Sequence, residues 1–343
     1  KLKGQPRKFH HSCVGADNMK YLLKQIGLYL VAAWASLTLN FFLPRMMPGD
    51  PVTALIGRMR GRLTPGEIEA IRQAYGFTNG PLVEQYIQYL SHALRGDFGV
   101  SISAYPAQVS SIIATGFMWT LLLGAVTLLI SFVLGTALGV IIAWKRNGFL
   151  DSTLPGLTGF VGSFPYFWLA MVALYYLGFE LGWFPMAHAY SDYLSPGFTW
   201  EYISSVMLHM VLPAVTIILV SVGGWMMGMR STMISVLNED YIIMAEAKGL
   251  SQRTVMFKYA MRNAILPNIT QFGMSIGFIL AGQLLTEMVF SYPGLGFYLV
   301  RSVTTLDYPL MQALFLMITM AVLAANFLVD ILYVQLDPRV RVS

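Results

Sequence analysis

The sequence predicts an all-α, polytopic membrane protein with six transmembrane helices. Of its 343 residues, 56% are hydrophobic and only 11% carry a charge, whereas a soluble globular domain has about 25% charged residues. Several long stretches also lack Asp, Glu, Lys and Arg altogether. Each is long enough for a helix to cross the hydrocarbon layer, which takes about 20 residues. These six windows are residues 25–44, 117–144, 152–179, 202–229, 263–286 and 308–329.

The windows are expected to be helices because lipid offers no hydrogen-bond partner to the backbone. Each span must therefore satisfy its own N–H and C=O groups. Strands of a membrane barrel would be shorter and would alternate in polarity, and these windows do neither. The hydrophobic content likewise excludes a disordered chain.

The first window follows a basic tail, residues 1–24, which we assign to the cytoplasm. The apolar run after Lys20 and Lys24 is similar to a signal peptide, but no small-residue cleavage site follows it. We therefore expect an uncleaved first span and one transmembrane domain over residues 25–343. The single cysteine, Cys13, leaves no role for disulfides.

The distribution of Lys and Arg among the links sets the orientation, because short cytoplasmic links carry an excess of both. Lys145 and Arg146 follow the second window, and five basic residues lie within 230–262, whereas residues 180–201 contain none. We therefore expect both termini in the cytoplasm. This topology also accounts for the net charge of +5, and no basic, aromatic-rich soluble face points to nucleic acid.

The segment between the first two windows, residues 52–116, is predicted to be folded on the outer side. A first helix is expected over 64–76, where Thr64 and Glu67 form a capping box. A second is expected over 81–96, which has an apolar stripe and ends in glycine. Such helices suit either a cap over the bundle or a docking surface for a soluble partner.

Small residues four positions apart predict close helix packing in the second and fourth windows. They are Gly135 with Gly139, and Gly224 with Gly228.

The fifth window contains Gly273-Met274-Ser275-Ile276-Gly277, which matches the Gly-x-Ser-x-Gly nucleophile pattern. An intramembrane serine hydrolase using Ser275 is therefore an alternative. That chemistry needs a strained turn or a nearby His, and no His follows Ser275 in the sequence. Helix packing is the favoured interpretation.

Polar residues within the later spans are candidates for function, because polar and charged groups are costly inside a bilayer. They either line a polar path for a solute or bond to neighbouring helices. We expect Asp330, near the cytoplasmic end of the last span, to pair with Arg230 or Arg262. The candidate path residues are Gln271, Gln283, Glu287 and Asn326.

The link over residues 238–262 mixes acidic, basic and small residues, and Gly249 and Ser251 break it into two helical stretches. A helix, a glycine turn and a second helix could project small side chains into the cleft of a partner. The alternative is a solvated connector.

Motifs for nucleotide and metal chemistry are absent. No Gly-x-x-x-x-Gly-Lys-Ser/Thr sequence occurs, so the chain has no phosphate-binding loop of its own. The five His residues form no metal spacing. We therefore expect no catalytic residue, no metal and no cofactor bound by this chain.

Several motifs together resemble one family, the first of the two inner-membrane permeases in ATP-binding-cassette importers for oligopeptides and dipeptides. The resemblance extends from Met19 to Arg341. One departure is Ile243-Met244-Ala245, where importers often have Glu-Ala-Ala. The matching segments are residues 47–51 (Met-Pro-Gly-Asp-Pro), 96–99 (Gly-Asp-Phe-Gly), 240–251, 259–267, 287–296, 307–309 (Asp-Tyr-Pro) and 336–341.

The resemblance implies the type I importer permease fold and a non-catalytic subunit of the inner (plasma) membrane. It implies that residues 245–251 insert into a groove of a separate ATPase subunit, which uses ATP and Mg²⁺. The implied partners are a second permease in a heterodimer, two ATPase subunits, an extracytoplasmic substrate-binding protein and membrane lipid. The implied ATPase-coupling residues are Asp240, Ala245, Glu246, Ala247, Lys248, Gly249, Leu250 and Ser251.

The resemblance favours oligopeptide as the solute, with short oligosaccharide as the alternative, since the outer link 183–200 is rich in aromatic residues. A secondary carrier working alone is a further alternative. It predicts related halves and paired ionisable groups within the spans, and neither is present.

Overall fold

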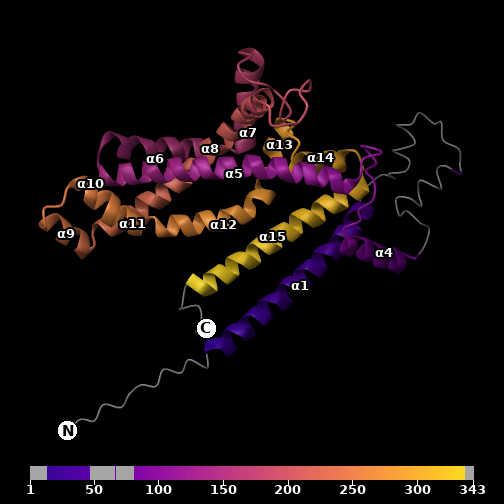
Figure 1. Cartoon of the computed structure of the whole chain (residues 1–343), viewed down its shortest axis with the longest axis horizontal. Helices are drawn as coiled ribbons and strands as arrows, with labels where there is room; N and C mark the ends of the chain where they lie inside the picture. The colour runs from indigo at the N-terminus through magenta and orange to yellow at the C-terminus, as the bar shows by residue number, and fades with distance from the viewer. Residues whose placement is uncertain (1–13, 47–65, 67–80, 337–343) are drawn as a thin grey trace, which may run out of the picture.

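The computed structural model describes residues 14–46, 66 and 81–336, which form helices joined by turns and by two longer loops over 96–108 and 181–199 (Figure 1). In this part of the chain the only β pairing is an isolated bridge between Val100 and Gln108, so the all-α prediction is confirmed. The elements are α1 (Val14–Met46), α4 (Leu82–Arg95), α5 (Val109–Trp144), α6 (Phe149–Gly162), α7 (Tyr166–Ala173), the π-helix η1 (Leu174–Glu180), α8 (Trp200–Leu237), α9 (Asp240–Ala247), α10 (Gln252–Thr254), the π-helix η2 (Val255–Ala260), α11 (Met261–Ala264), α12 (Leu266–Gly282), α13 (Leu284–Val289), α14 (Leu295–Thr304) and α15 (Tyr308–Leu336).

Four helices of the described residues are long and apolar enough to cross a membrane. They correspond to the first, second, fourth and sixth windows of the sequence. The 36 residues of α5 span about 54 Å, which exceeds the ~30 Å hydrocarbon layer. The ends of α5 therefore extend beyond the lipid. The four spans are Gln25–Leu43 in α1, all of α5, all of α8, and Tyr308–Ile331 in α15.

The third window is not one straight helix, as the sequence led us to expect. It consists of α6 and of α7 with η1, which are bent by 89° relative to each other, and α7 stands away from the line of α6 in Figure 1. The break falls at Pro165, which has extended backbone angles and precedes the first residue of α7. Proline disfavours the helical conformation of the residue before it and has no N–H to donate. The window is thus a bent pair of helices, in the geometry of a broken span or of a re-entrant loop.

The fifth window is also interrupted. Helix α12 has 17 residues, at the lower end of what can cross a bilayer, and Gln283 separates it from α13. By length and composition the described helices supply four spans, or five if the bent pair counts as one. Helix α12 occupies the position of the remaining predicted span.

Helices α5 and α8 form the most extensive helix pair. A Cβ added at Gly135 would lie 2.8 Å from the Val222 carbonyl oxygen, and one at Gly139 would lie 2.6 Å from that of Met226. The predicted close packing is confirmed for these glycines. It is wrong for Gly224, whose added Cβ would have no atom of the described chain within 4 Å, whereas one at Gly228 would lie 3.2 Å from the Asn268 Oδ1.

Helices α1 and α15 run side by side as a diagonal pair in Figure 1. The Tyr29 hydroxyl donates to the Asp330 carboxylate at 2.7 Å, and the Asn40 side chain donates to the Gln312 carbonyl at 2.6 Å. The predicted pairing of Asp330 with Arg230 or Arg262 is therefore wrong. Arg230 instead pairs with Asp151 of α6 at 2.6 Å.

The predicted second helix of the 52–116 segment is confirmed as α4, which ends at Gly96 with a φ of 69°. The loop that follows α4 is tied to the start of α15 through the buried carboxylate of Asp307. The predicted helix over 64–76 lies outside the described residues except for Gly66, as do Cys13, the 47–51 motif and most of the 336–341 motif.

Candidate functional site

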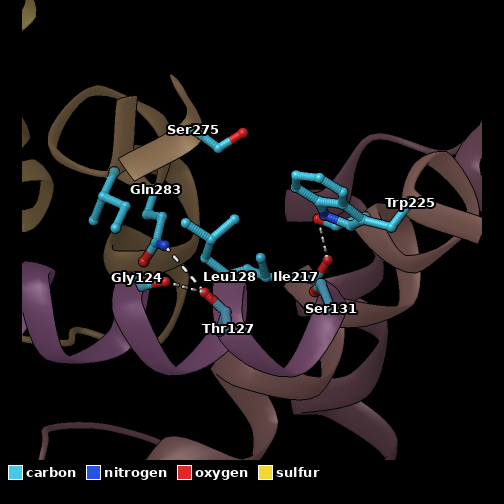
Figure 2. A pocket seen from close by; sticks show the side chains of 10 residues that line it. Gly124, Thr127, Leu128, Ser131, Ile217, Trp225, Ser275 and Gln283 are labelled. Atoms are coloured by element: carbon cyan, nitrogen blue, oxygen red, sulfur yellow. Dashed lines mark hydrogen bonds between the residues drawn. The ribbon is translucent and has the colours of Figure 1, made fainter. Parts of the chain in front are cut away.

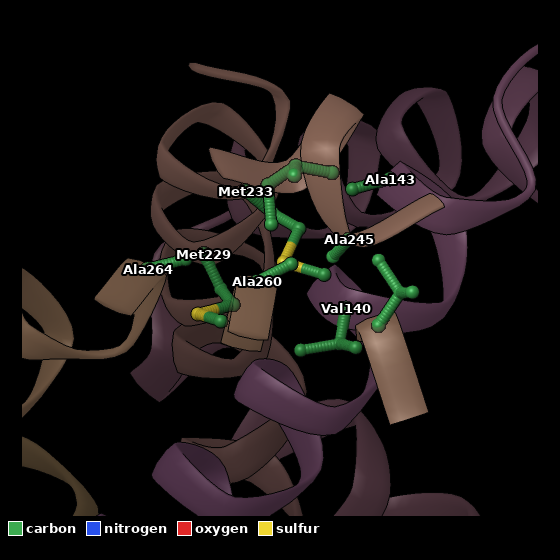
Figure 3. Packing of buried hydrophobic residues seen from close by; sticks show 9 residues of the cluster. Val140, Ala143, Met229, Met233, Ala245, Ala260 and Ala264 are labelled. Atoms are coloured by element: carbon green, nitrogen blue, oxygen red, sulfur yellow. The ribbon is translucent and has the colours of Figure 1, made fainter. Parts of the chain in front are cut away.

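One end of the bundle carries the short helix α9, which is seated on the α5 and α8 helices (Figure 3). Its side chains Ile242 and Ala245 are only 2% and 3% exposed. They pack into a hydrophobic cluster that includes Ala143 of α5 and Met233 of α8. Helix α9 is thus fixed in position by packing against other helices of its own chain.

The turn after α9 has a fixed shape. Gly249 has a φ of 73°, a conformation that other residues adopt only with strain. The Ser251 hydroxyl then accepts a hydrogen bond from the Thr254 N–H and so caps the next helical stretch. The predicted break between two helices at Gly249 and Ser251 is confirmed.

The outward face of this segment, by contrast, exposes large apolar side chains. Ile243 is 57% exposed, Met244 61% and Phe257 55%. Exposed apolar side chains that lie together in this way are typical of surfaces that contact a protein or a membrane. Of the predicted coupling residues, Ala245 faces inward. The outward-facing ones are Asp240, Glu246, Ala247, Lys248, Gly249, Leu250 and Ser251.

A second candidate site lies midway along α5, where one face of the helix is polar or small. Gly124, Thr127 and Ser131 recur at spacings of three and four residues. They line a pocket of about 250 Å³ between α5, α8 and α12 (Figure 2). The Gln283 amide, from the break after α12, donates to the Thr127 hydroxyl at 3.3 Å. Polar groups therefore gather in the middle of the bundle.

Ser275 lies on the wall of this pocket, and no His is among the lining residues. Its hydroxyl donates to the Gln271 carbonyl of its own helix at 2.8 Å. His209 bonds to the Ser205 carbonyl in α8. A Cβ at Gly277 would collide with Ala325 of α15. The geometry supports helix packing at this motif and not the hydrolase alternative.

The buried carboxylate of Glu287 is fully engaged within the chain. It accepts a hydrogen bond from the Thr120 hydroxyl and one from the Gly296 N–H, both at 2.7 Å. Thr120 also accepts from the Leu295 N–H at 2.8 Å. Glu287 therefore fixes the start of α14 against α5, where a carboxylate complements the helix N-terminus.

The structure brings together only part of the predicted translocation path. Gln283 lines the central pocket, and it lines a neighbouring pocket of about 220 Å³ together with Glu287. Gln271 is exposed on α12 and Asn326 is half-buried on α15. Neither of the two residues lines these pockets.

Sequence reasoning missed Thr127 and Ser131, because hydroxyl residues in a span usually bond to their own helix backbone and attract no attention. The available signal was the regular spacing of Thr120, Gly124, Thr127 and Ser131 on one helix face. It also missed Ile243 and Met244 as outward-facing residues. Among the described residues, no group of three His, Cys, Asp or Glu could hold a metal ion.

Comparison with known proteins agrees with this architecture. The profile of a family described as "Binding-protein-dependent transport system inner membrane component" matches residues 135–342. The chain is 33% identical over 327 residues to a dipeptide transport system permease protein of Lactococcus lactis subsp. cremoris, covering 94% of this chain and 99% of the relative. It is 34% identical over 324 residues to a glutathione transport system permease protein of Escherichia coli K12, again covering 94% and 99%. An oligopeptide transport system permease protein of Bacillus subtilis is 32% identical over 322 residues, with the same coverage.

Proposed function

Because the chain belongs to the family of binding-protein-dependent transport system inner membrane components, we propose that it is the permease subunit of an ATP-driven peptide importer. It forms the translocation path with a second permease subunit, and a soluble binding protein delivers the peptide from the outer side. The subunit itself is not an enzyme. Two separate ATPase subunits bind ATP and Mg²⁺ and supply the energy.

The observation that carries this proposal is the seating of α9. Its inner face packs through Ile242 and Ala245 into a cluster with residues of α5, α8 and η2, while Ile243 and Met244 point outward. A force applied to the outer face is therefore passed to two membrane-crossing helices, because packed interiors are dense and transmit strain. This arrangement suits a rigid-body rocking of helices between inward and outward access.

The ATPase would bind the outward face of α9 and the turn that follows it. The apolar side chains of Ile243, Met244 and Leu250 provide the buried area, since all three are exposed in this chain. Glu246 and Lys248 flank them and fix the register by charge. In this proposal the energy of ATP hydrolysis reaches the chain through this contact, because its sequence contains no phosphate-binding loop.

Peptide is favoured over short oligosaccharide as the solute because the relatives above are named as permeases for dipeptides, oligopeptides and glutathione, which is itself a peptide. The orientation follows from the position of α9. The start of α1 and the end of α15 lie on the same side of Figure 1 as α9 to α11. With α9 at the ATPase, both ends of the chain face the cytoplasm.

The test is purification of the full-length chain from native membranes, followed by reconstitution in lipid vesicles. We expect a second permease and two ATPase subunits to accompany the chain. With the binding protein outside and ATP at the ATPase side, the vesicles should accumulate labelled peptide. Uphill uptake by this chain alone, or a complete complex that accumulates sugar and no peptide, would contradict the proposal.

A further inference from the structure

The pocket between α5, α8 and α12 has a polar wall about midway along α5 (Figure 2). Several of its hydroxyls already bond to their own helices: Thr127 donates to the Leu123 carbonyl at 2.9 Å, and Ser221 to that of Ile217 at 2.7 Å. Its lining contains no charged residue. The pocket is thus polar but neutral.

Two polar atoms on this wall have no hydrogen-bond partner within the described part of the chain, namely the Ser131 Oγ and the Gln283 Oε1. Ser131 is 1% exposed and Gln283 is 9% exposed. Buried polar atoms without partners are rare in native proteins because they lose their water without compensation. Of the five such atoms in the described residues, these two belong to side chains that line the same pocket, where a ligand could supply the missing bonds.

The pocket lies on the side of α5 that faces α8 and α12. The other side of that helix exposes Leu122, Leu129 and Val133 by 40%, 54% and 52%, as suits contact with acyl chains. Gly124, Thr127 and Ser131 lie on the opposite side. An acyl chain would leave the two polar atoms unsatisfied, so the polar side belongs to the solute path.

We infer that this pocket binds one backbone amide of a peptide as it crosses the bilayer, an inference that rests on the proposed function. The Gln283 Oε1 accepts a hydrogen bond from the peptide N–H, and the Ser131 hydroxyl donates one to a peptide carbonyl. The ring of Trp225 and the side chains of Leu128 and Ile217 form the apolar part of the lining. A charged peptide terminus finds no counter-charge here and is disfavoured.

The size of the pocket agrees with this ligand. About 250 Å³ corresponds to roughly eight water molecules at ~30 Å³ each, so a peptide unit can enter as water leaves. Because every peptide has a backbone amide, such a site accepts peptides regardless of their side chains. Selection among peptides then falls to other parts of the importer.

The test uses the complete importer in lipid vesicles and compares a peptide with its depsipeptide, in which one amide N–H is replaced by an ester oxygen. Peptide uptake is divided by the amount of ATP hydrolysed in response to the loaded binding protein. This ratio corrects for differences in how well the binding protein delivers the two ligands. Loss of one hydrogen bond should lower uptake of the ester about fivefold in the wild type. In Gln283→Met this discrimination should vanish, because the acceptor is gone.

Ser131→Ala removes the donor and should lower peptide uptake about fivefold while the amide-over-ester preference remains. Ser111→Ala removes an exposed hydroxyl from the same helix and should change neither quantity. An amide-over-ester preference that is absent in the wild type, or unchanged in Gln283→Met, overturns the inference and leaves the proposed function intact. A complex that imports no peptide although its ATPase responds to the binding protein overturns the proposed function itself.

Discussion

Asp307 accepts hydrogen bonds from both the backbone N–H and the hydroxyl of Ser103, each at 2.8 Å, across 204 residues of sequence. The same carboxylate accepts from the Leu310 N–H at 3.3 Å and so caps the first turn of α15. Two segments that are far apart in the sequence, 101–103 and 307–310, therefore meet at one buried side chain. The loop after α4 and the start of α15 are positioned together.

Replacing Asp307 with Ala should loosen this junction. The backbone N–H groups of Ser103 and Leu310 lose their acceptor, and loss of the helix cap alone costs about 1 kcal/mol. Hydrogen exchange followed by mass spectrometry should show faster exchange over 101–104 and 308–311. The control is Asp97→Ala, which removes an exposed carboxylate from the same loop. Unchanged exchange at both segments in Asp307→Ala would refute the assignment.

The hydrogen bond from the Thr120 hydroxyl to the Glu287 carboxylate should stabilise the folded protein. Thr120→Val keeps the shape of the side chain but removes one donor to a fully buried carboxylate, which costs about 1–3 kcal/mol. Unfolding of the reconstituted protein by denaturing detergent should therefore begin earlier. Thr115→Val, an exposed change on the same helix, should leave the transition in place. Equal transitions for the two variants would show that the bond contributes nothing.

The outward face of α9 should be required for binding of the ATPase. We expect Met244→Glu to prevent co-purification of the ATPase, because a charge replaces an apolar side chain in the contact. Insertion of the chain into the membrane should stay normal. Leu94→Glu places the same charge on an exposed apolar position of α4 and serves as the control. Retention of the ATPase by Met244→Glu would exclude this face as the docking surface.

Glycine should be required at position 249 because the turn after α9 needs a left-handed backbone conformation there. A Cβ at this position meets no atom of the described chain within 4 Å, so steric clash is not the limit, but a φ of 73° disfavours β-branched residues. Gly249→Val should reduce peptide-stimulated ATP hydrolysis more than Gly249→Asn, since Asn tolerates the left-handed region. The measurement is ATP hydrolysis by the reconstituted complex. Equal loss in both variants would indicate that the contact with the ATPase, and not the turn, requires glycine.

The sequence was sufficient where local physics decides the outcome. Charge-free windows located α1, α5, α8 and α15, because the cost of a charge in lipid depends on the segment alone. The bend at Pro165 could also have been predicted from the sequence, because proline stops a helix locally. It was missed because the window was defined only by its lack of charged residues. Gly249 marked its turn for the same local reason.

The sequence was insufficient where distant segments meet. Nothing near Asp330 indicates that its partner is Tyr29, because that choice depends on how α1 and α15 cross. The inward direction of Ala245 likewise depends on the cluster beneath α9. The central pocket needed three helices to be placed before Ser131 and Gln283 could be seen as one site.

The pairing of α1 with α15 has a consequence for biogenesis. The Tyr29–Asp330 bond joins residues 301 positions apart, and a ribosome adding about 5–20 residues per second needs roughly 15–60 s to make the intervening chain. The first helix therefore enters the bilayer long before its mate exists. Until α15 has been made, α1 is in contact with lipid or with the insertion machinery. The packing of α1 against α15 is therefore among the last events of assembly.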